Sequence, residues 1–280
     1  MFTVLDKSWK HYDIDYKCGV NKYIFNPNVI GTGMYFTTAE FVPLFLKCGA
    51  LIAKISIPLD TQIRTCKSGN EWETDELIVH DVYPIEDWDK WKDPDFCLAA
   101  VRQNGLAIKF CLNQTPEICL AAIQQNGNAL QFCLDQTEEL CLLAIKQNVK
   151  NLIFVQKPTD KICLIAFHSN GMLLRFVLNQ TEELCLAAVR QNGLAIKFCL
   201  NQTPEICLAA VQSNGLALKF CLEQTEEICL AAVRQNGDAL EFCLDQTKEI
   251  CLEAVKQDED SFYYVEGQFK EICLQAIKQI

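Results

Sequence analysis

The chain has 280 residues, half of them hydrophobic, and a formal net charge of −11. This length and composition suffice for a packed core and suggest one or two domains, while the negative charge argues against general affinity for nucleic acid or an anionic membrane. No apolar run approaches the roughly 18 residues of a membrane span, and the N-terminus lacks the basic start of a signal peptide, so we expect a soluble intracellular protein.

Residues 1–92 differ in composition from the rest of the chain and contain all four tryptophans. Strand-like runs occur at residues 34–36, 51–57 and 76–79, and a helix is expected at residues 38–48. The sequence therefore predicts a small N-terminal α+β module.

A connecting segment with Trp88 and Trp91 ends this module. Because the exposed face of an end repeat needs a cap, we expect the two indole rings to cover the first repeat.

Residues 31–36 read Gly-Thr-Gly-Met-Tyr-Phe, and residues 76–81 read Glu-Leu-Ile-Val-His-Asp. These segments resemble the Gly-x-Gly-Ile-Tyr-Phe and Glu-Tyr-Ile-Val-Tyr-Asp segments of poly-ADP-ribose polymerases. The resemblance implies that Tyr35 stacks on nicotinamide and Glu76 polarises the acceptor, with His11 as the candidate for holding the NAD ribose. Tyr12 stands where that family has a glycine after the histidine. The alternative is a glycine turn into one strand and an ordinary edge strand, and on that basis we expect no catalytic residue and no cofactor.

Residues 93–280 consist of about eight and a half copies of a 22-residue unit. One cysteine marks each copy: Cys97, Cys119, Cys141, Cys163, Cys185, Cys207, Cys229, Cys251 and Cys273. A threonine followed by proline or an acidic residue signals the start of a first helix, and Asn-Gly signals its end, with glycine in the left-handed C-terminal conformation. A shorter second helix, typified by residues 194–200, completes a helical hairpin.

One such hairpin cannot bury its apolar face, so the units must stack on one another. The predicted fold is therefore mainly α: a right-handed α-solenoid over residues 93–280 behind the module of residues 1–92. Small residues would let helices approach closely, and we expect one phenylalanine per unit to fill the core: Phe110, Phe132, Phe154, Phe176, Phe198, Phe220 and Phe242. Asn-Gly is also typical of β-hairpins, and leucine-rich repeats have a similar period, but no alternating strand pattern and no Leu-x-Leu signature accompanies it.

Two positions of the unit hold most of the 17 cysteines. Equivalent cysteines of stacked units lie too far apart for disulfides, and no Cys-x-x-Cys or Cys/His cluster indicates a metal site. We expect small buried apolar residues in a reducing compartment. Val155, Val177 and Val265 replace cysteine at the second position, as an apolar role predicts.

A mainly basic and polar column lies near the end of the first helix, and a column of glutamates lies at its start. The helix dipole accounts for this division, which we expect to leave ridges of opposite charge on opposite edges that could steer a charged partner. The first column is the candidate binding surface: Arg102, Gln124, Lys146, His168, Arg190, Gln212, Arg234 and Lys256.

Glutamines recur beside this column and between the units, where we expect their amides to hydrogen-bond the turns of the next unit. Some helical repeats instead read one RNA base per unit. The near identity of the units and the net charge of −11 argue against that alternative.

Residues 16–21, 31–41 and 55–58 read Tyr-Lys-Cys-Gly-Val-Asn, Gly-Thr-Gly-Met-Tyr-Phe-Thr-Thr-Ala-Glu-Phe and Ile-Ser-Ile-Pro. They are similar to a leader module that precedes ankyrin repeats in proteins of mimivirus-group giant viruses. The repeats resemble short helical repeats of unknown function from the same viruses.

The two resemblances imply a viral protein that acts in an infected protist, in the host cytoplasm or the viral factory. We expect a scaffold that binds a host or viral protein through the repeats. An NAD-using enzyme in the leader and a structural protein of the virion or viral factory are the alternatives. The oligomeric state stays open.

Overall fold

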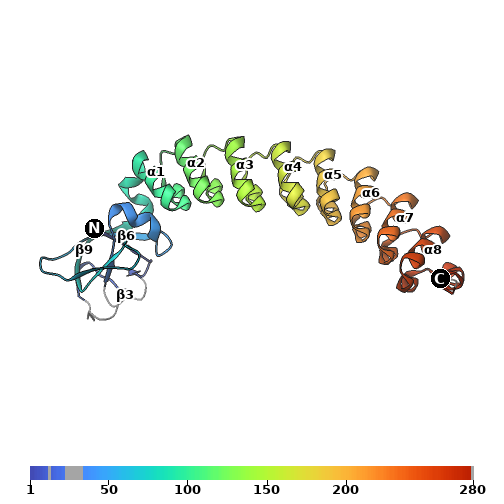
Figure 1. The fold of residues 1–280 in the computed structure, drawn as a ribbon, viewed down its shortest axis with the longest axis horizontal. Coiled ribbons are helices and arrows are strands. Elements are labelled where there is room, and N and C mark those ends of the chain that lie inside the picture. Colours follow the sequence, from blue (N-terminus) through green and yellow to red (C-terminus); the bar gives the residue numbers. More distant parts are fainter. Residues whose placement is uncertain (12–13, 23–33, 279–280) are drawn as a thin grey trace. The chain divides into compact units, whose positions relative to one another are not determined.

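The computed structural model describes residues 1–11, 14–22 and 34–278. Strands occupy the N-terminal part, and helical units with a period of about 22 residues follow (Figure 1). The chain divides into two compact units, Met1–Ala144 and Ile145–Ile280. The domain boundary expected after residue 92 stays a prediction.

Four strands form the main antiparallel sheet of the N-terminal part, in the order β1 (Phe2–Leu5), β6 (Leu51–Ser56), β9 (Glu76–Pro84) and β4 (Gly19–Lys22). A second sheet has the order β5 (Met34–Phe36), β8 (Trp72–Thr74) and β7 (Ile63–Thr65), and a short hairpin joins β2 (Lys10–His11) to β3 (Ile14–Asp15). The strands expected at residues 34–36, 51–57 and 76–79 are thereby confirmed. Leu5, Met34, Phe36, Ile55 and Leu77 belong to the shared core.

The helix expected at residues 38–48 is a 3-10 segment, η1 (Ala39–Phe45). Pro43 lies inside it and has no N–H to donate, which disfavours a regular α-helix. Two side chains of the first repeat bond to this segment: Gln103 donates to the Glu40 carbonyl at 2.9 Å, and Asn104 donates to that of Pro43 at 3.0 Å.

The connecting segment forms two 3-10 turns, η2 (Ile85–Asp87) and η3 (Asp89–Lys92). Trp91 is fully buried, its indole N–H donates to the Ile85 carbonyl at 2.7 Å, and its ring stacks on Phe110 with centroids 5.2 Å apart. Trp88 packs edge-on against Phe96. The expected aromatic cap of the first repeat is confirmed.

The α-helices of the repeats begin after a capping threonine, or after Asp93 in the first repeat, except for α9, which follows Phe269 and has no side-chain cap. Thr203, for example, accepts a hydrogen bond from the Ile206 N–H at 3.3 Å, and Asp93 caps the first helix in the same way. No helix among the described residues is long and apolar enough to cross a membrane. The helices are α1 (Pro94–Gln103), α2 (Pro116–Gln125), α3 (Glu138–Gln147), α4 (Asp160–Ser169), α5 (Glu182–Gln191), α6 (Pro204–Ser213), α7 (Glu226–Gln235), α8 (Lys248–Gln257) and α9 (Lys270–Ile277).

The second segment of each repeat is a 3-10 helix, which corrects the predicted second helix at residues 194–200. It ends at Phe198, and six residues are too few to form a stable α-helix. Asn192 is extended and its side chain accepts from the Leu194 N–H at 3.1 Å, so the asparagine caps this segment. These segments are η4 (Gly105–Phe110), η5 (Gly127–Phe132), η6 (Val149–Phe154), η7 (Gly171–Phe176), η8 (Gly193–Phe198), η9 (Gly215–Phe220), η10 (Gly237–Phe242) and η11 (Glu259–Tyr264), with a further short turn at η12 (Gly267–Phe269).

The glycine of Asn-Gly has a different role from the one predicted. Among the described residues, the glycines with positive φ are Gly19 and Gly69, so no repeat glycine is a left-handed cap. A Cβ on Gly215 would instead lie 2.5 Å from the Ala232 carbonyl oxygen of the next helix. Glycine is needed because successive repeats approach closely at this point.

The phenylalanine column is also placed differently from the prediction. Small and aliphatic side chains such as Ala195 and Ile196 are fully buried in the repeat, whereas Phe198 is only half-buried. Phe176 is 41% exposed, and the Arg175 guanidinium lies 4.4 Å from its ring centroid. The phenylalanine ends the 3-10 segment, so its ring covers the edge of the repeat, where a basic side chain can lie over it.

Gly215→Ala should lower the free energy of unfolding by about 1–3 kcal/mol, because the added methyl group meets a backbone oxygen that cannot move aside freely. Gly267→Ala is the control: its Cβ would meet nothing within 4 Å, and its φ is not positive. Urea unfolding of both variants measures the difference. Equal stabilities would show that the repeats are not held at this distance by the glycine.

Candidate protein-binding surface

His11 lies at the end of β2 in the interior of the N-terminal part. Its Nδ1 is 2.7 Å from the Val4 carbonyl oxygen and 3.2 Å from the Thr3 hydroxyl. Its Nε2 is 3.1 Å from a carboxylate oxygen of Glu71, which is also buried. Protein groups therefore surround both ring nitrogens.

In the structure, the ring of Tyr35 lies against the ring of His11. The two rings stack with centroids 5.7 Å apart, and burial raises the pKa of Tyr35. Glu76 is at the start of β9, where its carboxylate lies 3.0 Å from the Lys22 ammonium. The Gly-Thr-Gly part of the motif, residues 31–33, lies outside the described residues, as does Tyr12.

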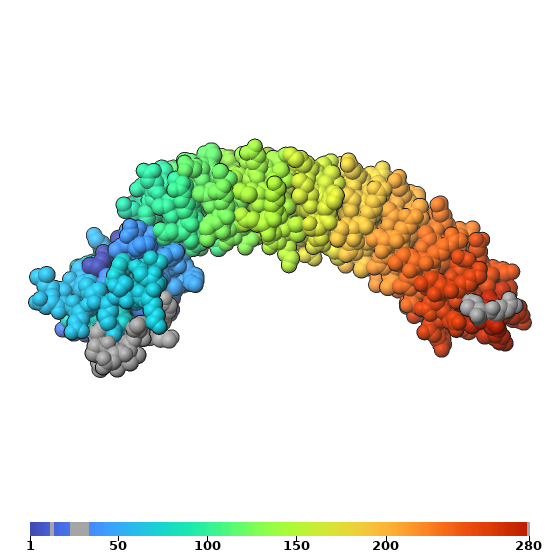
Figure 2. Space-filling model, viewed as in Figure 1, coloured from blue at the N-terminus to red at the C-terminus, as the bar shows by residue number. Residues whose placement is uncertain are grey.

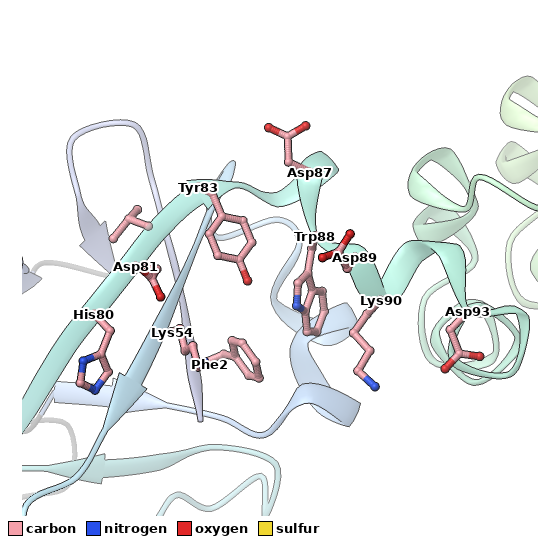
Figure 3. Close-up of a pocket in the computed structure, with 11 residues that line it drawn as sticks. Phe2, Lys54, His80, Asp81, Tyr83, Asp87, Trp88, Asp89, Lys90 and Asp93 are labelled. Atoms are coloured by element: carbon pink, nitrogen blue, oxygen red, sulfur yellow. The ribbon is translucent and has the colours of Figure 1, made fainter.

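A cleft of about 980 Å³ lies beside the main sheet, and the sequence did not predict it (Figure 3). Phe2 and Trp88 contact each other there with ring centroids 5.1 Å apart. Lysines, aspartates and one histidine surround the aromatic pair: Lys54, Lys90, Asp81, Asp87, Asp89, Asp93 and His80. Asp89 is bound by Lys92 at 2.6 Å, which lowers its pKa. No cluster of His, Cys, Asp or Glu suited to a metal ion occurs among the described residues.

Shallow grooves lie between successive α-helices of the repeats. One of about 420 Å³ separates α5 from α6, another of about 410 Å³ separates α6 from α7, and a groove of about 520 Å³ separates α1 from α2. Each combines a leucine, an alanine, a glutamine, an arginine and a glutamate. Five residues of the predicted binding column line these grooves: Arg102, Gln124, Arg190, Gln212 and Arg234.

The two charged columns are not on opposite edges, as the sequence suggested. The Arg102 guanidinium lies 3.3 Å from the Glu117 carboxylate at the start of the next helix. The helix dipole places the arginine at one helix end and the glutamate at the other, and neighbouring helices then bring them together. The grooves therefore carry mixed charge rather than one sign.

The other members of the predicted column have local contacts. The His168 Nδ1 is 2.7 Å from the Leu164 carbonyl of its own helix, and Lys256 lies 3.3 Å from Glu253. Lys146 is exposed on α3.

The predicted bonds from the recurring glutamines to the next unit are confirmed for the set between the units, whereas the set beside the column bonds the preceding unit. The Gln180 amide donates to the Phe198 carbonyl at 2.9 Å and accepts from the Leu200 N–H at 2.9 Å. In the second set, the Gln191 amide accepts from the Gly171 N–H at 2.7 Å. These amides satisfy the backbone of an adjacent repeat, so they are not available for reading nucleic-acid bases.

An exposed leucine follows the 3-10 segment in most repeats, with 59% to 84% of its surface accessible: Leu112, Leu134, Leu178, Leu200, Leu222 and Leu244. We call these six residues the leucine row. The sequence shows the recurrence, but residues 194–200 were predicted as helix, which concealed that this position lies in an exposed turn. Single exposed leucines are ordinary, whereas their recurrence at one repeat position makes the leucines of each compact unit a second candidate contact surface.

The described repeats define a helical-repeat protein. Residues 115–157, 181–225, 203–248 and 225–270 match a domain of unknown function (DUF4116), so this repeat domain occurs four times across residues 115–270. No curated protein and no solved structure matches the chain. The expected likeness to repeats of unknown function is confirmed, and that description assigns no activity.

The Glu253 carboxyl should titrate below the ordinary 4.5, because Arg234 at 3.0 Å and then Lys256 stabilise its charged form. Its pairing therefore stabilises the fold above the ordinary pKa and is lost as the pH falls through the lowered one. Carbon-detected NMR titration measures the shift. Arg234→Gln should return the pKa toward its ordinary value, and an unchanged value would contradict the ion pair.

Proposed function

We propose that the chain is a protein-binding scaffold and that it binds a segment of a host or viral protein across the grooves between its α-helices. The observation that carries this proposal is the recurrence of the same groove lining between successive helices. Five of the residues singled out from sequence contribute to it. Repeated shallow grooves suit an extended or helical protein segment better than a small molecule, which binds in enclosed pockets.

The composition of the grooves indicates the chemistry of the partner. Leu120, Leu208 and Leu230 offer apolar contact. An arginine of one helix lies opposite a glutamate of the next in the α1–α2 and α5–α6 grooves, whereas the arginine and the glutamates of the α6–α7 groove all lie on α7. A matching segment would place apolar side chains between the helices and charges of both signs at the rims. The charges would set orientation and register, and the apolar contacts would supply most of the affinity.

Within this proposal, the repeats stack as a right-handed α-solenoid, which would align the grooves into a longer surface. Support comes from the packing of each α-helix on the next, both for α1 and α2 and for α4 to α9. The resemblances to giant-virus proteins support a role in an infected protist cell, in the cytoplasm or viral factory. A structural role in the virion would instead require the protein to be abundant in purified particles.

The stacking of His11 on Tyr35 favours a second candidate, an NAD-using enzyme of the ADP-ribosyltransferase kind. Against it, the His11 ring is buried among protein groups and Glu76 is paired with Lys22. We therefore rank this activity below the scaffold. NAD consumption by the purified chain that disappears in Glu76→Ala would reverse the order.

Reversing two charges in the grooves, Arg190→Glu with Arg234→Glu, should abolish retention of the partner by the full chain. Both side chains are exposed, so the fold should be preserved although the Arg234–Glu253 ion pair is lost, and circular dichroism checks the helical content of the variant. The measurement is affinity capture from a nuclease-treated lysate of infected cells, read by mass spectrometry against the wild-type chain.

The matched control is Lys197→Glu with Lys219→Glu, which makes the same charge change on the 3-10 segments. It should retain the same protein as the wild type. Loss of binding in the control alone would show that the partner binds the face of the 3-10 segments. Leu200→Ser with Leu222→Ser would then test the leucine row. Equal retention by all variants would refute a repeat-borne surface of either kind.

A further inference from the structure

The 3-10 segments of three successive repeats present a basic side chain at the same repeat position. Arg175 of η7, Lys197 of η8 and Lys219 of η9 are all exposed. The three segments pack side by side in the compact unit of residues 145–280, and Figure 2 shows these repeats, coloured yellow to orange, without a gap between them. The three cations therefore form a short row across neighbouring repeats.

The basic side chains of this row lie over phenylalanine rings. The Lys197 ammonium is 5.0 Å from the ring centroid of Phe198 and 5.9 Å from that of Phe220 in the next repeat. The Lys219 ammonium is likewise 4.9 Å from the centroid of Phe220 and 5.6 Å from that of Phe242. Attraction to the rings of two repeats holds each ammonium in the row. We call the following six residues the basic strip: Arg175, Phe176, Lys197, Phe198, Lys219 and Phe220.

The cations of the basic strip are not neutralised by the chain itself. The segments η7, η8 and η9 contain no acidic residue, and no ion pair found among the described residues includes a cation of the strip. On the α-helices, by contrast, Arg102 is bound to Glu117 and Arg234 to Glu253. Because the chain as a whole has a net charge of −11, three unpaired cations in a row are a local exception that attracts an acidic partner.

The basic strip has defined ends. The same repeat position holds Ile153 in the preceding repeat and Glu241 in the following one. The positive charge is therefore confined to three repeats, which limits the length of the partner that it can hold.

Part of the leucine row accompanies the basic strip. Leu178, Leu200 and Leu222 each stand three positions after a cation of the strip, and they are 84%, 65% and 77% exposed. Leucines suit the apolar side chains of a protein. Single-stranded nucleic acid instead stacks its bases on open aromatic rings, and each ring of the strip already has a basic side chain over it. The combination favours an acidic protein segment over a nucleic acid.

The spacing of the repeats indicates the conformation of such a segment. Packed helices lie about 8–10 Å apart, and an extended chain advances about 3.3 Å per residue. One repeat therefore corresponds to about three residues of an extended segment. A segment with an apolar and an acidic residue in every three would place one apolar side chain at each leucine and one carboxylate at each cation.

We propose that the basic strip, together with Leu178, Leu200 and Leu222, is a docking surface for an extended acidic protein segment. The segment spans about nine residues across the three repeats. Its carboxylates bind the cations and set its register, and its apolar side chains cover the leucines. This surface is on the 3-10 segments and does not depend on the grooves between the α-helices, so it takes a segment other than the one proposed for those grooves.

The probe that tests this proposal is a fluorescein-labelled synthetic peptide of four Leu-Asp-Ser triplets, and fluorescence anisotropy follows its binding to the full chain. We expect saturable binding that weakens as the salt concentration rises, because salt screens the attraction between exposed charges. A peptide of four Leu-Lys-Ser triplets and a polyuridylate of twelve nucleotides should not bind. If the Leu-Asp-Ser peptide fails to bind, or the polyuridylate binds more tightly, the proposal is wrong.

Two variants that lose the same net charge locate the binding. The first replaces the three cations of the basic strip: Arg175→Gln, Lys197→Gln and Lys219→Gln. The matched control replaces three cations on the α-helices of the same compact unit: Arg190→Gln, Arg234→Gln and Lys256→Gln. The first variant should bind the Leu-Asp-Ser peptide about tenfold more weakly, since three exposed charge pairs are lost, and the control should bind it as the wild type does. Circular dichroism checks the helical content of both. Equal weakening in the two variants would overturn the proposal, because the net charge alone would then attract the peptide.

A further variant and a measurement of mass test the apolar contacts and the remaining occupant. Leu178→Ser with Leu200→Ser and Leu222→Ser should weaken binding and keep its salt dependence, whereas an unchanged affinity would contradict the role of the leucines. Sedimentation of the full chain without peptide should give the same mass for the wild type and for the variant of the basic strip. A wild-type dimer that this variant dissociates would show that a second copy of the chain covers the strip, and the proposal of a separate acidic segment would then fail.

Discussion

The repeats depend on a side chain that satisfies the backbone of its neighbour. A six-residue 3-10 segment cannot pair all its own N–H and C=O groups, and burying them unpaired would cost about 1–3 kcal/mol each. Gln180 and its equivalents supply both a donor and an acceptor to the following repeat, and Gln191 supplies an acceptor to the preceding one. Glycine at the start of the 3-10 segment permits the short distance at which these bonds form. The backbone groups of a repeat are therefore fully hydrogen-bonded only when another repeat lies beside it.

Because polar side chains are used to join neighbouring repeats, only some side chains remain exposed to contact a partner. The amides, the threonine hydroxyls and the asparagines are used inside the fold, as caps or as bridges. What faces solvent is the groove lining on the α-helices, the leucine row, and the basic side chains over the phenylalanine edges. These surfaces combine leucine and phenylalanine side chains with charges of both signs, which suits recognition of protein better than of a polyanion.

The sequence predicts most of what is local. Threonine caps, the aromatic cover of the first repeat and the glutamine bridges follow from side-chain chemistry and spacing, and all are found. The errors share one cause: the distance and orientation between neighbouring repeats cannot be inferred from the sequence of a single repeat. The 3-10 segment, the close contact at Gly215 and the half-exposed Phe198 all depend on how near the next helix lies. The pairing of Arg102 with Glu117 likewise joins positions that lie far apart in the sequence.

The hydrogen bonds that the recurring glutamines form between repeats affect how the number of repeats can change during evolution. Most repeats form the same bonds with their neighbours, although Pro158 replaces a glutamine of one set and Ser169 and Ser213 replace glutamines of the other. A whole copy can therefore be added or lost while most of these bonds form again. Residues 97–122 are identical to residues 185–210, as expected of a recent block duplication. Gene recombination can thus alter the number of grooves in one step, while the residues within each groove change slowly by point mutation. The number of grooves and the composition of each groove can therefore change independently of each other.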